Sequence, residues 1–337
     1  MRDCCRDRED VGDASAVIDF VTKALVFPFA VSWLVIALRL RFSGRGLDHP
    51  GHRSLHERPT PYGGGLGIVT ALLAAGTLLG VPAMFLGAAL VLAALSLLDD
   101  IMHLPFWLRL AVHLAAAAAL CSLLDLPGWL WLPTLLAVGW MTNLFNFMDG
   151  ADGLAGSQGV TGFSAYAAGF ILAGDYTMAL WCAAIAAACT GFLWFNWPPA
   201  RVFMGDVGSI PLGFLAGGLG AWGAWGGEWP LWFPALVFSP FVLDATITLV
   251  RRTLHGQRVW DAHREHYYQR MVRMGYGHRG MTLRWGAVMV VGSLLAVGLL
   301  VVPASLQWFG ATIWLAVLIG LGSLVDSRWY EYKKENE

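Results

Sequence analysis

The sequence contains few charged residues, because Asp, Glu, Lys and Arg make up only 13% of its 337 positions. A soluble domain carries about a quarter charged residues, so this deficit argues against an ordinary water-soluble fold. The formal net charge is -1, so the charge balance gives no sign of the basic surface that nucleic acid requires. We therefore expect no nucleic-acid partner and a surface that faces lipid.

Cysteine is scarce, and its spacing excludes the common cysteine-based sites. None of the cysteines forms a C-x-x-C pair, and three lie in apolar runs, so we interpret them as small core residues rather than a disulfide or zinc set. A secretory signal peptide is also missing, since residues 1–20 form a polar tail with charges of both signs. We expect the first apolar run to be a retained helix. The cysteines are Cys4, Cys5, Cys121, Cys182 and Cys189.

Long apolar runs occupy most of the sequence. A helix needs roughly 20 apolar residues to cross a bilayer, and about eleven runs approach that length. We predict an all-α polytopic membrane protein that forms a single domain over residues 1–337, with a large cytoplasmic loop at 251–282 and a cytoplasmic tail at 327–337. The runs are 21–40, 64–80, 82–98, 107–124, 128–145, 159–173, 178–195, 208–225, 229–250, 283–302 and 306–325.

The basic residues indicate how the chain crosses the membrane. Arginines follow the first and the ninth run, and Lys333 and Lys334 lie near the C-terminus, whereas the alternate loops near Val81, Asp175 and Val302 lack Lys and Arg. Positively charged loops stay in the cytoplasm, so we predict an outside N-terminus and a cytoplasmic C-terminus. The arginines are Arg41, Arg45, Arg53, Arg58, Arg251, Arg252, Arg258, Arg264, Arg270, Arg273 and Arg279.

Four polar motifs fall on the predicted cytoplasmic side. The first is Asp99-Asp100, directly after the third run, where adjacent like charges cost free energy unless a cation or a task compensates. The alternative interpretation is a solvated helix end. Arg109 follows near the start of the fourth run, where it either has a function beside this pair or extends its side chain towards the interface.

The second motif combines amides and carboxylates at the end of the fifth run. Asn143, Asn146 and Asp149 are spaced by three, so they share a helix face, and glycines surround Asp152 in the sequence that follows. Oxygen ligands of this kind suit Mg²⁺, which keeps waters or substrate phosphates as further ligands. The position two residues after Asp149 is Ala151, which excludes a calcium loop of the EF-hand type.

The third motif, Phe195 to Ser209, contains a Pro-Pro pair and then Gly-Asp-x-Gly-Ser at a predicted helix start, which favours phosphate groups. Asp206 is a candidate second metal ligand, and Phe203 either stacks on a base or anchors the loop in lipid. The fourth motif, His263 to Arg270, places His263, Arg264 and His266 in the largest loop. It lacks a further zinc ligand at matching spacing, so phosphate contacts fit it better.

In this order and topology, the four motifs resemble the polyprenyl-phosphate N-acetylhexosamine-1-phosphate transferases, glycosyltransferase family 4. The loop Arg53 to Gly65 also resembles that family's first cytoplasmic loop, although Tyr62 departs from the usual form. The last loop lacks the run of nearly consecutive histidines found in the peptidoglycan branch. It is more similar to the branch that starts O-antigen or related surface polysaccharides.

The resemblance implies a role for each matching residue. Asn146 and Asp206 match ligands of Mg²⁺, for which Mn²⁺ is a possible substitute. Uracil binding is implied for Asp149 and Phe203, and further substrate binding for Arg109, Asn143 and Arg264. The catalytic candidates are Asp99 and Asp100 beside the lipid phosphate, together with Asp152, His263 and His266.

The implied reaction transfers N-acetylhexosamine-1-phosphate from a UDP-sugar to undecaprenyl phosphate and releases UMP at the cytoplasmic face of a bacterial inner membrane. A transporter is one alternative, but it predicts charges near mid-helix and an internal repeat. Another alternative is a lipid-linked phosphotransferase of the CDP-alcohol type, which needs an Asp-Gly-x-x-Ala-Arg signature. Here Asp149-Gly150-Ala151-Asp152 is followed by Gly-Leu, so the arginine of that signature is missing. The sugar and the oligomeric state stay open.

Overall fold

Helices make up nearly all of the computed structural model, which describes residues 21–42, 46–48, 50, 55–56, 58–258 and 263–336. The predicted polar tail at 1–20, with Cys4 and Cys5, lies outside these residues, as do Arg45 and Arg53. The described cysteines Cys121, Cys182 and Cys189 are free and buried, which confirms their interpretation as core residues.

Each predicted apolar run overlaps at least one helix. The first half of the chain forms the π-helical turn η1 (Thr22–Val26), α2 (Phe27–Phe42), the two-residue strands β1 (Leu47–Asp48) and β2 (Thr60–Pro61), α3 (Gly65–Leu79), α4 (Ala83–Met102), α5 (Phe106–Cys121), α6 (Gly128–Phe147) and α7 (Leu154–Ala173). The second half forms α8 (Tyr176–Asn196), α9 (Asp206–Gly226), α10 (Trp232–Val237), α11 (Ser239–Leu254), α12 (Tyr267–Met271), the π-helical turn η2 (Val272–Tyr276), α13 (Gly277–Leu300) and α14 (Ala304–Asn336).

The structure corrects one expectation about the second half and adds helices to two predicted segments. The ninth run is two helices, because Phe238 leaves the helical conformation. The next helix begins at Ser239, and Pro240 in its first turn has no N–H to donate. The predicted loop at 251–282 holds the end of α11, all of α12 and the start of α13. The predicted tail at 327–337 continues α14 as far as Asn336. Charged residues hid these helices, since they interrupt the apolar pattern without breaking the backbone.

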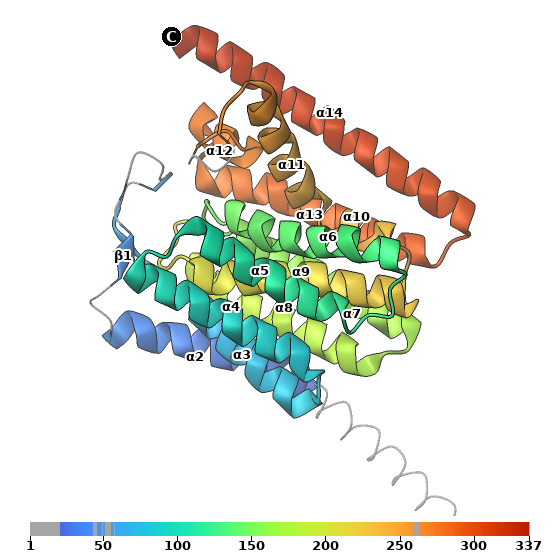
Figure 1. Cartoon of the computed structure of the whole chain (residues 1–337). Helices are drawn as coiled ribbons and strands as arrows, with labels where there is room; N and C mark the ends of the chain where they lie inside the picture. Colours follow the sequence, from blue (N-terminus) through green and yellow to red (C-terminus); the bar gives the residue numbers. More distant parts are fainter. Residues whose placement is uncertain are drawn as a thin grey trace, which may run out of the picture.

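The protein is a polytopic membrane protein. Within the described residues, six helices are long and apolar enough to cross a bilayer, and the apolar helices α3 and α5 are shorter. The six are Thr22–Phe42, Ala83–Met102, Tyr176–Asn196, Asp206–Gly226, Tyr267–Leu300 and Ala304–Asn336. In Figure 1 the helices lie side by side, and β1 and α12 lie at the same end of the bundle, where the chain also forms the polar loops.

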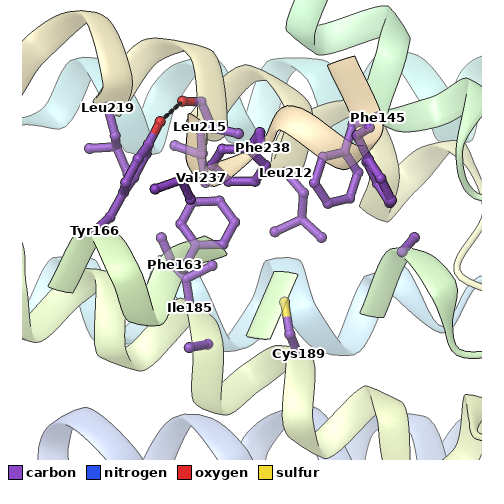
Figure 2. Close-up of a cluster of buried hydrophobic side chains, with 14 of the residues drawn as sticks. Phe145, Phe163, Tyr166, Ile185, Cys189, Leu212, Leu215, Leu219, Val237 and Phe238 are labelled. Atoms are coloured by element: carbon purple, nitrogen blue, oxygen red, sulfur yellow. Dashed lines mark hydrogen bonds between the residues drawn. The ribbon is translucent and has the colours of Figure 1, made fainter. Parts of the chain in front are cut away.

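Aromatic rings fill the centre of the bundle where α6, α7, α9 and the α10–α11 junction meet (Figure 2). Phe163, Tyr166 and Phe238 are fully buried and contact one another edge to face. The Tyr166 hydroxyl donates a hydrogen bond to the Ala216 carbonyl at 2.9 Å, so this buried polar group is satisfied. The core therefore fixes the ends of these helices relative to one another.

Two glycines allow α3 and α9 to touch where the polar loops begin. A Cβ atom at Gly65 would collide with the backbone of Gly208, so neither position has room for a side chain. The N–H of Gly64 donates to the Phe203 carbonyl at 2.8 Å, and the N–H of Gly65 donates to the Met204 carbonyl at 2.9 Å. This contact places the first residue of α9, Asp206, beside the start of α3.

We expect the substitution Gly65→Ala to lower the stability of the protein by about 1–3 kcal/mol, the usual cost of overpacking a tight contact. The melting temperature of the purified protein in detergent measures this loss. Gly87→Ala in α4 is the matched control, because a Cβ there meets nothing within 4 Å. Its effect should stay within about 1 kcal/mol, and an equal loss in both variants would refute the role of the α3–α9 contact.

Candidate active site

Loops at one end of the bundle enclose an open cavity of about 750 Å³. The α4 end, the α6–α7 loop, the α8–α9 loop and the start of α13 all contribute to its wall. Six predicted site residues line it, namely Asp100, Asn146, Asp149, Asp152, Phe203 and Asp206. Its other polar and aromatic lining includes His56, Tyr62, His103, Asn196, Gln269 and His278.

Asp206 and Asn146 meet at the centre of this wall. Asp206 is the first residue of α9, after Gly205, whose positive φ of 71° turns the chain into the helix. Asn146 lies in the last turn of α6, and its side chain forms a hydrogen bond to the Asp206 carboxylate. Ser209 donates a hydrogen bond to Asn146 Oδ1 at 2.8 Å, which orients that amide. The two predicted ligands thus face the same space, at the positive end of the α9 dipole.

Negative charge accumulates around this pair. Asp99, Asp100 and Asp149 all interact electrostatically with the Asp206 carboxylate. Arg109 Nη1 lies 2.6 Å from Asp99 Oδ2 and 3.9 Å from Asp206 Oδ2, so one guanidinium is shared between two carboxylates. The excess of carboxylates favours a cation or a cation-bound phosphate in the cavity.

The donor set fits a magnesium ion held by few protein ligands. In the part of the chain that the structure describes, no three His, Cys, Asp or Glu side chains lie close enough together to hold a metal. Mg²⁺ does not need such a cluster, since one or two carboxylates plus waters and substrate phosphates complete its octahedron. Asp206 and the amide oxygen of Asn146 supply the hard oxygen donors that such an ion prefers.

The structure separates the two adjacent aspartates. Asp100 lines the cavity, whereas Asp99 is not among the lining residues and both of its carboxylate oxygens form hydrogen bonds. Asp99 Oδ1 accepts a hydrogen bond from the Leu104 N–H at 2.7 Å, and Asp99 Oδ2 pairs with Arg109. Asp99 therefore closes the α4–α5 turn and holds Arg109 near Asp206, while its predicted catalytic role stays a prediction.

Asp149 and Asp152 lie in the loop between α6 and α7 but have opposite surroundings. Burial raises the pKa of Asp149, and the charge of Asp206 raises it further, against a hydrogen bond from the Gly205 N–H. Burial also acts to raise the pKa of Asp152, but the hydrogen bond and charge of His278 outweigh it, so the pKa falls below the usual value. Asp149 is thus easier to protonate than Asp152.

Asp152 connects three segments around the cavity. Its Oδ2 accepts a hydrogen bond from the Ala200 N–H at 2.9 Å, and its Oδ1 lies 3.1 Å from His278 Nδ1. The Thr282 hydroxyl donates to the Asp152 carbonyl at 2.6 Å. These contacts join the α6–α7 loop to the α8–α9 loop and to α13. These contacts do not test the predicted catalytic role of Asp152, which stays a prediction.

Phe203 lies on the cavity wall against the first loop. Its ring centroid is 4.8 Å from that of His56, and the two rings are tilted by 58°. The Phe203 N–H donates to the Pro61 carbonyl at 2.8 Å, next to Tyr62, which also lines the cavity. Phe203 lines the same cavity as Asp149 and Asp206, and an aromatic ring is a group on which a base can stack.

The other predicted residues lie away from the cavity lining. Asn143 donates to the Gly139 carbonyl at 2.8 Å and contacts His113, one turn before Asn146 in α6. Neither His263, Arg264 nor His266 is among the cavity-lining residues. Burial, aided by the charges of His266 and Arg252, lowers the pKa of His263 to about 4, so its imidazole is neutral near pH 7.

Sequence reasoning missed several residues that the structure brings to the site. His278 and Gln269 line the cavity but lie among arginines that were interpreted as positive-inside charge. Asp244 is buried in α11 and contacts His266 at 3.1 Å. A signal existed for Asp244, because a carboxylate inside an apolar run is by default functional or structurally paired.

A comparison with protein families agrees with this geometry. Residues 82–223, which include α4 to α9 and most of the cavity wall, match the model of glycosyl transferase family 4. The chain belongs to this family. It is a membrane-embedded transferase, and the matched segment contains every predicted site residue except those after α9.

Individual relatives match across most of the chain. It is 28% identical to a probable undecaprenyl-phosphate N-acetylglucosaminyl 1-phosphate transferase of Bacillus subtilis, over 88% of both chains. It is 28% identical to a decaprenyl-phosphate N-acetylglucosaminephosphotransferase of Mycolicibacterium smegmatis, over 81% of this chain and 80% of that protein. A phospho-N-acetylmuramoyl-pentapeptide-transferase of Picosynechococcus sp. is 31% identical, but over only 47% of this chain and 41% of its own.

If Asp206 and Asn146 hold a divalent cation, Mg²⁺ or Mn²⁺ should raise the melting temperature of the purified protein, because a ligand stabilises the state that binds it. The rise should disappear in Asp206→Asn. Glu228→Gln removes one acid just beyond the opposite end of α9 and should retain the rise. An equal rise in the wild type and in Asp206→Asn would show that the cation binds elsewhere.

Proposed function

We propose that the protein transfers N-acetylhexosamine-1-phosphate from a UDP-sugar to undecaprenyl phosphate, with UMP as the leaving product. The observation that carries the proposal is the single cavity in which Asp100, Asn146, Asp149, Phe203 and Asp206 meet. These residues come from three separate parts of the chain, namely the end of α4, the α6–α7 junction and the α8–α9 junction. Relatives named for the same type of transfer, with N-acetylglucosamine as the sugar, match most of the chain and support it.

The proposed chemistry is an in-line displacement at phosphorus. An oxygen of the lipid phosphate attacks the sugar-linked phosphorus, and the bond to the UMP oxygen breaks. Asn146 and Asp206 would hold Mg²⁺, which when bound offsets the charge of the diphosphate. Under this proposal, Arg109 contacts phosphate as a planar fork, and Phe203 and Asp149 bind the uracil. Positioning and electrostatics supply most of the catalysis in such reactions.

The nucleophile needs little help from a base. A phosphate monoester has a second pKa of about 6, so the lipid phosphate is largely dianionic near neutral pH. The engagement of both Asp99 oxygens by Leu104 and Arg109 agrees with a role in holding Arg109 rather than in removing a proton. Asp100, which faces the cavity, is the better placed of the two to orient the acceptor.

The proposed topology has about eleven transmembrane spans with an outside N-terminus, so the cavity opens to the cytoplasm of a bacterial inner membrane. This placement explains how a very apolar acceptor is used. Moving the polyprenyl tail into water costs about 0.8 kcal/mol per CH₂, so the tail stays in the bilayer while the UDP-sugar arrives from the cytosol.

We assign the product to O-antigen or another cell-surface polysaccharide rather than to peptidoglycan. The sequence His263-Arg264-Glu265-His266 lacks a run of consecutive histidines, and the pentapeptide transferase relative matches less than half of the chain. A transporter has less support, since the acids of the site lie at helix ends and in loops rather than at mid-helix.

Membranes that contain the protein should release UMP from UDP-N-acetylglucosamine or a related UDP-N-acetylhexosamine when undecaprenyl phosphate and Mg²⁺ are present. Asp206→Ala should lower this rate by at least about a hundredfold, as the loss of a metal ligand or its direct support does. Chelation of the cation should have the same effect. If no UDP-sugar of a panel yields UMP with the wild type, the proposed reaction is wrong.

The role of Asp99 can be tested by the pH dependence of Asp99→Asn. If Asp99 holds Arg109, the variant should lose activity at every pH, because the position of the guanidinium does not depend on the proton of the acceptor. If Asp99 is instead a general base, activity should recover at high pH, where the lipid phosphate is already dianionic. Rates between about pH 5 and pH 9, a range that begins below the phosphate's second pKa of about 6, distinguish the two roles.

A further inference from the structure

A buried carboxylate that the proposed reaction does not use holds the short helix α12 at the edge of the cavity. Asp244 in α11 is 1% exposed. Its Oδ1 accepts a hydrogen bond from the Tyr267 N–H at 2.9 Å, and its Oδ2 accepts one from the Tyr268 N–H at 3.1 Å. The first N–H groups of a helix have no partner within the helix, so Asp244 satisfies two of them.

Two side-chain contacts complete the anchor. His266 Nδ1 lies 3.1 Å from Asp244 Oδ1, and the Thr248 hydroxyl donates to the same oxygen at 3.3 Å. Four groups of α11, His266 and α12 therefore converge on one buried carboxylate. The start of α12 therefore has one defined position relative to α11.

Tyr268 connects the start of α12 to the loop that contains Asp149. Its side chain is 1% exposed, and its hydroxyl donates to the Phe147 carbonyl at 3.1 Å. The Gly150 N–H and the Gln269 side chain form hydrogen bonds with the same hydroxyl. A Cβ at Gly150 would collide with this oxygen, so the loop rests directly on Tyr268. Asp149 lies between the two residues that this hydroxyl contacts.

We infer that Asp244 is a positioning residue for the sugar-nucleotide part of the cavity, and this inference rests on the proposed function. Asp244 fixes the first turn of α12, and Tyr268 then fixes the Phe147–Gly150 turn that presents Asp149. Gln269, held in the same turn of α12, lines the cavity beside it. The lipid phosphate end, formed by Asp100 and Arg109, receives no contact from Asp244.

A second carboxylate anchors the same helix and provides a matched control. Asp326 in α14 accepts hydrogen bonds from Arg270 at 2.7 Å and from the Tyr267 hydroxyl at 3.1 Å. Arg251 binds it through both terminal nitrogens, at 2.9 and 2.7 Å. Asp326 therefore ties α12 to α14 and α11, but Tyr268 is not among its partners. A role in anchoring alone should be similar for both carboxylates.

The experiment compares Asp244→Asn, Tyr268→Phe, their double variant and Asp326→Asn by UMP release. Asn keeps one acceptor oxygen but turns an NH₂ group towards an N–H donor. We expect the KM for UDP-N-acetylglucosamine to rise roughly tenfold in Asp244→Asn and in Tyr268→Phe, as the loss of one strong hydrogen bond implies. The KM for lipid phosphate should change by less than about twofold. In free energy, a twofold change is less than half of the tenfold change expected for the UDP-sugar.

The double variant should be no worse than Asp244→Asn, because both residues act through the same contact. Asp326→Asn should leave the KM for the UDP-sugar within about twofold of the wild-type value. Multiplying effects in the double variant, or equal increases in both KM values, would overturn the inference. So would an effect of Asp326→Asn as large as that of Asp244→Asn.

Size-exclusion profiles and melting temperatures in detergent show whether each variant folds. If Asp244→Asn does not fold, Tyr268→Phe decides, since it removes a single oxygen. A folded Tyr268→Phe with the wild-type KM for the UDP-sugar would overturn the inference. If the wild type itself releases no UMP, the proposed function fails separately. The rise in melting temperature caused by UDP, with and without Asp244→Asn, then still tests the position of the nucleotide site.

Discussion

Repulsion among carboxylates is concentrated at the end of the bundle where the polar loops meet. Asp99, Asp100 and Asp149 each interact electrostatically with Asp206, and Arg109 is shared between Asp99 and Asp206. A chain gathers like charges in a partly buried place only when other interactions hold the segments together. In the proposed reaction, the same excess charge favours the binding of a divalent cation that offsets the charge of the diphosphate.

The segments are held by interactions that do not involve these charges. The glycine contact between α3 and α9 and the hydrogen bonds from Gly64 and Gly65 fix the start of α9. The contacts of Asp152 with Ala200 and His278 join the loops on the other side. Because the aromatic core below holds α6, α7 and α9, these loops cannot move apart to relieve the repulsion. Rigid packing of the helices therefore keeps the mutually repelling carboxylates close together.

How much of this was predictable differs by residue. The apolar runs predicted the helices, since lipid requires each spanning segment to satisfy its own backbone. The helix end at Asn146 and the start at Asp206 followed from residue spacing and glycine position, and the structure brings both to one wall. By contrast, His263 and His266 were expected in the site, yet they lie beside the buried Asp244 and outside the cavity lining. Gln269, three residues after His266, and His278, farther along the chain, line the cavity instead. Spacing along a loop does not reveal the direction of its side chains, which depends on where α12 is anchored.

The sequence by itself determined that this chain is a helical membrane protein with acidic motifs at one face, because hydropathy and charge are properties of local segments. It also determined the family, because the motifs are contiguous and distinctive. Only the tertiary structure decided which members of a motif line the cavity. Asp99 and Asp100 are neighbours in sequence, but one holds Arg109 and the other faces the cavity. Contacts between distant segments make that choice, since Asp244, Tyr268 and the α6–α7 turn meet only when the bundle is closed.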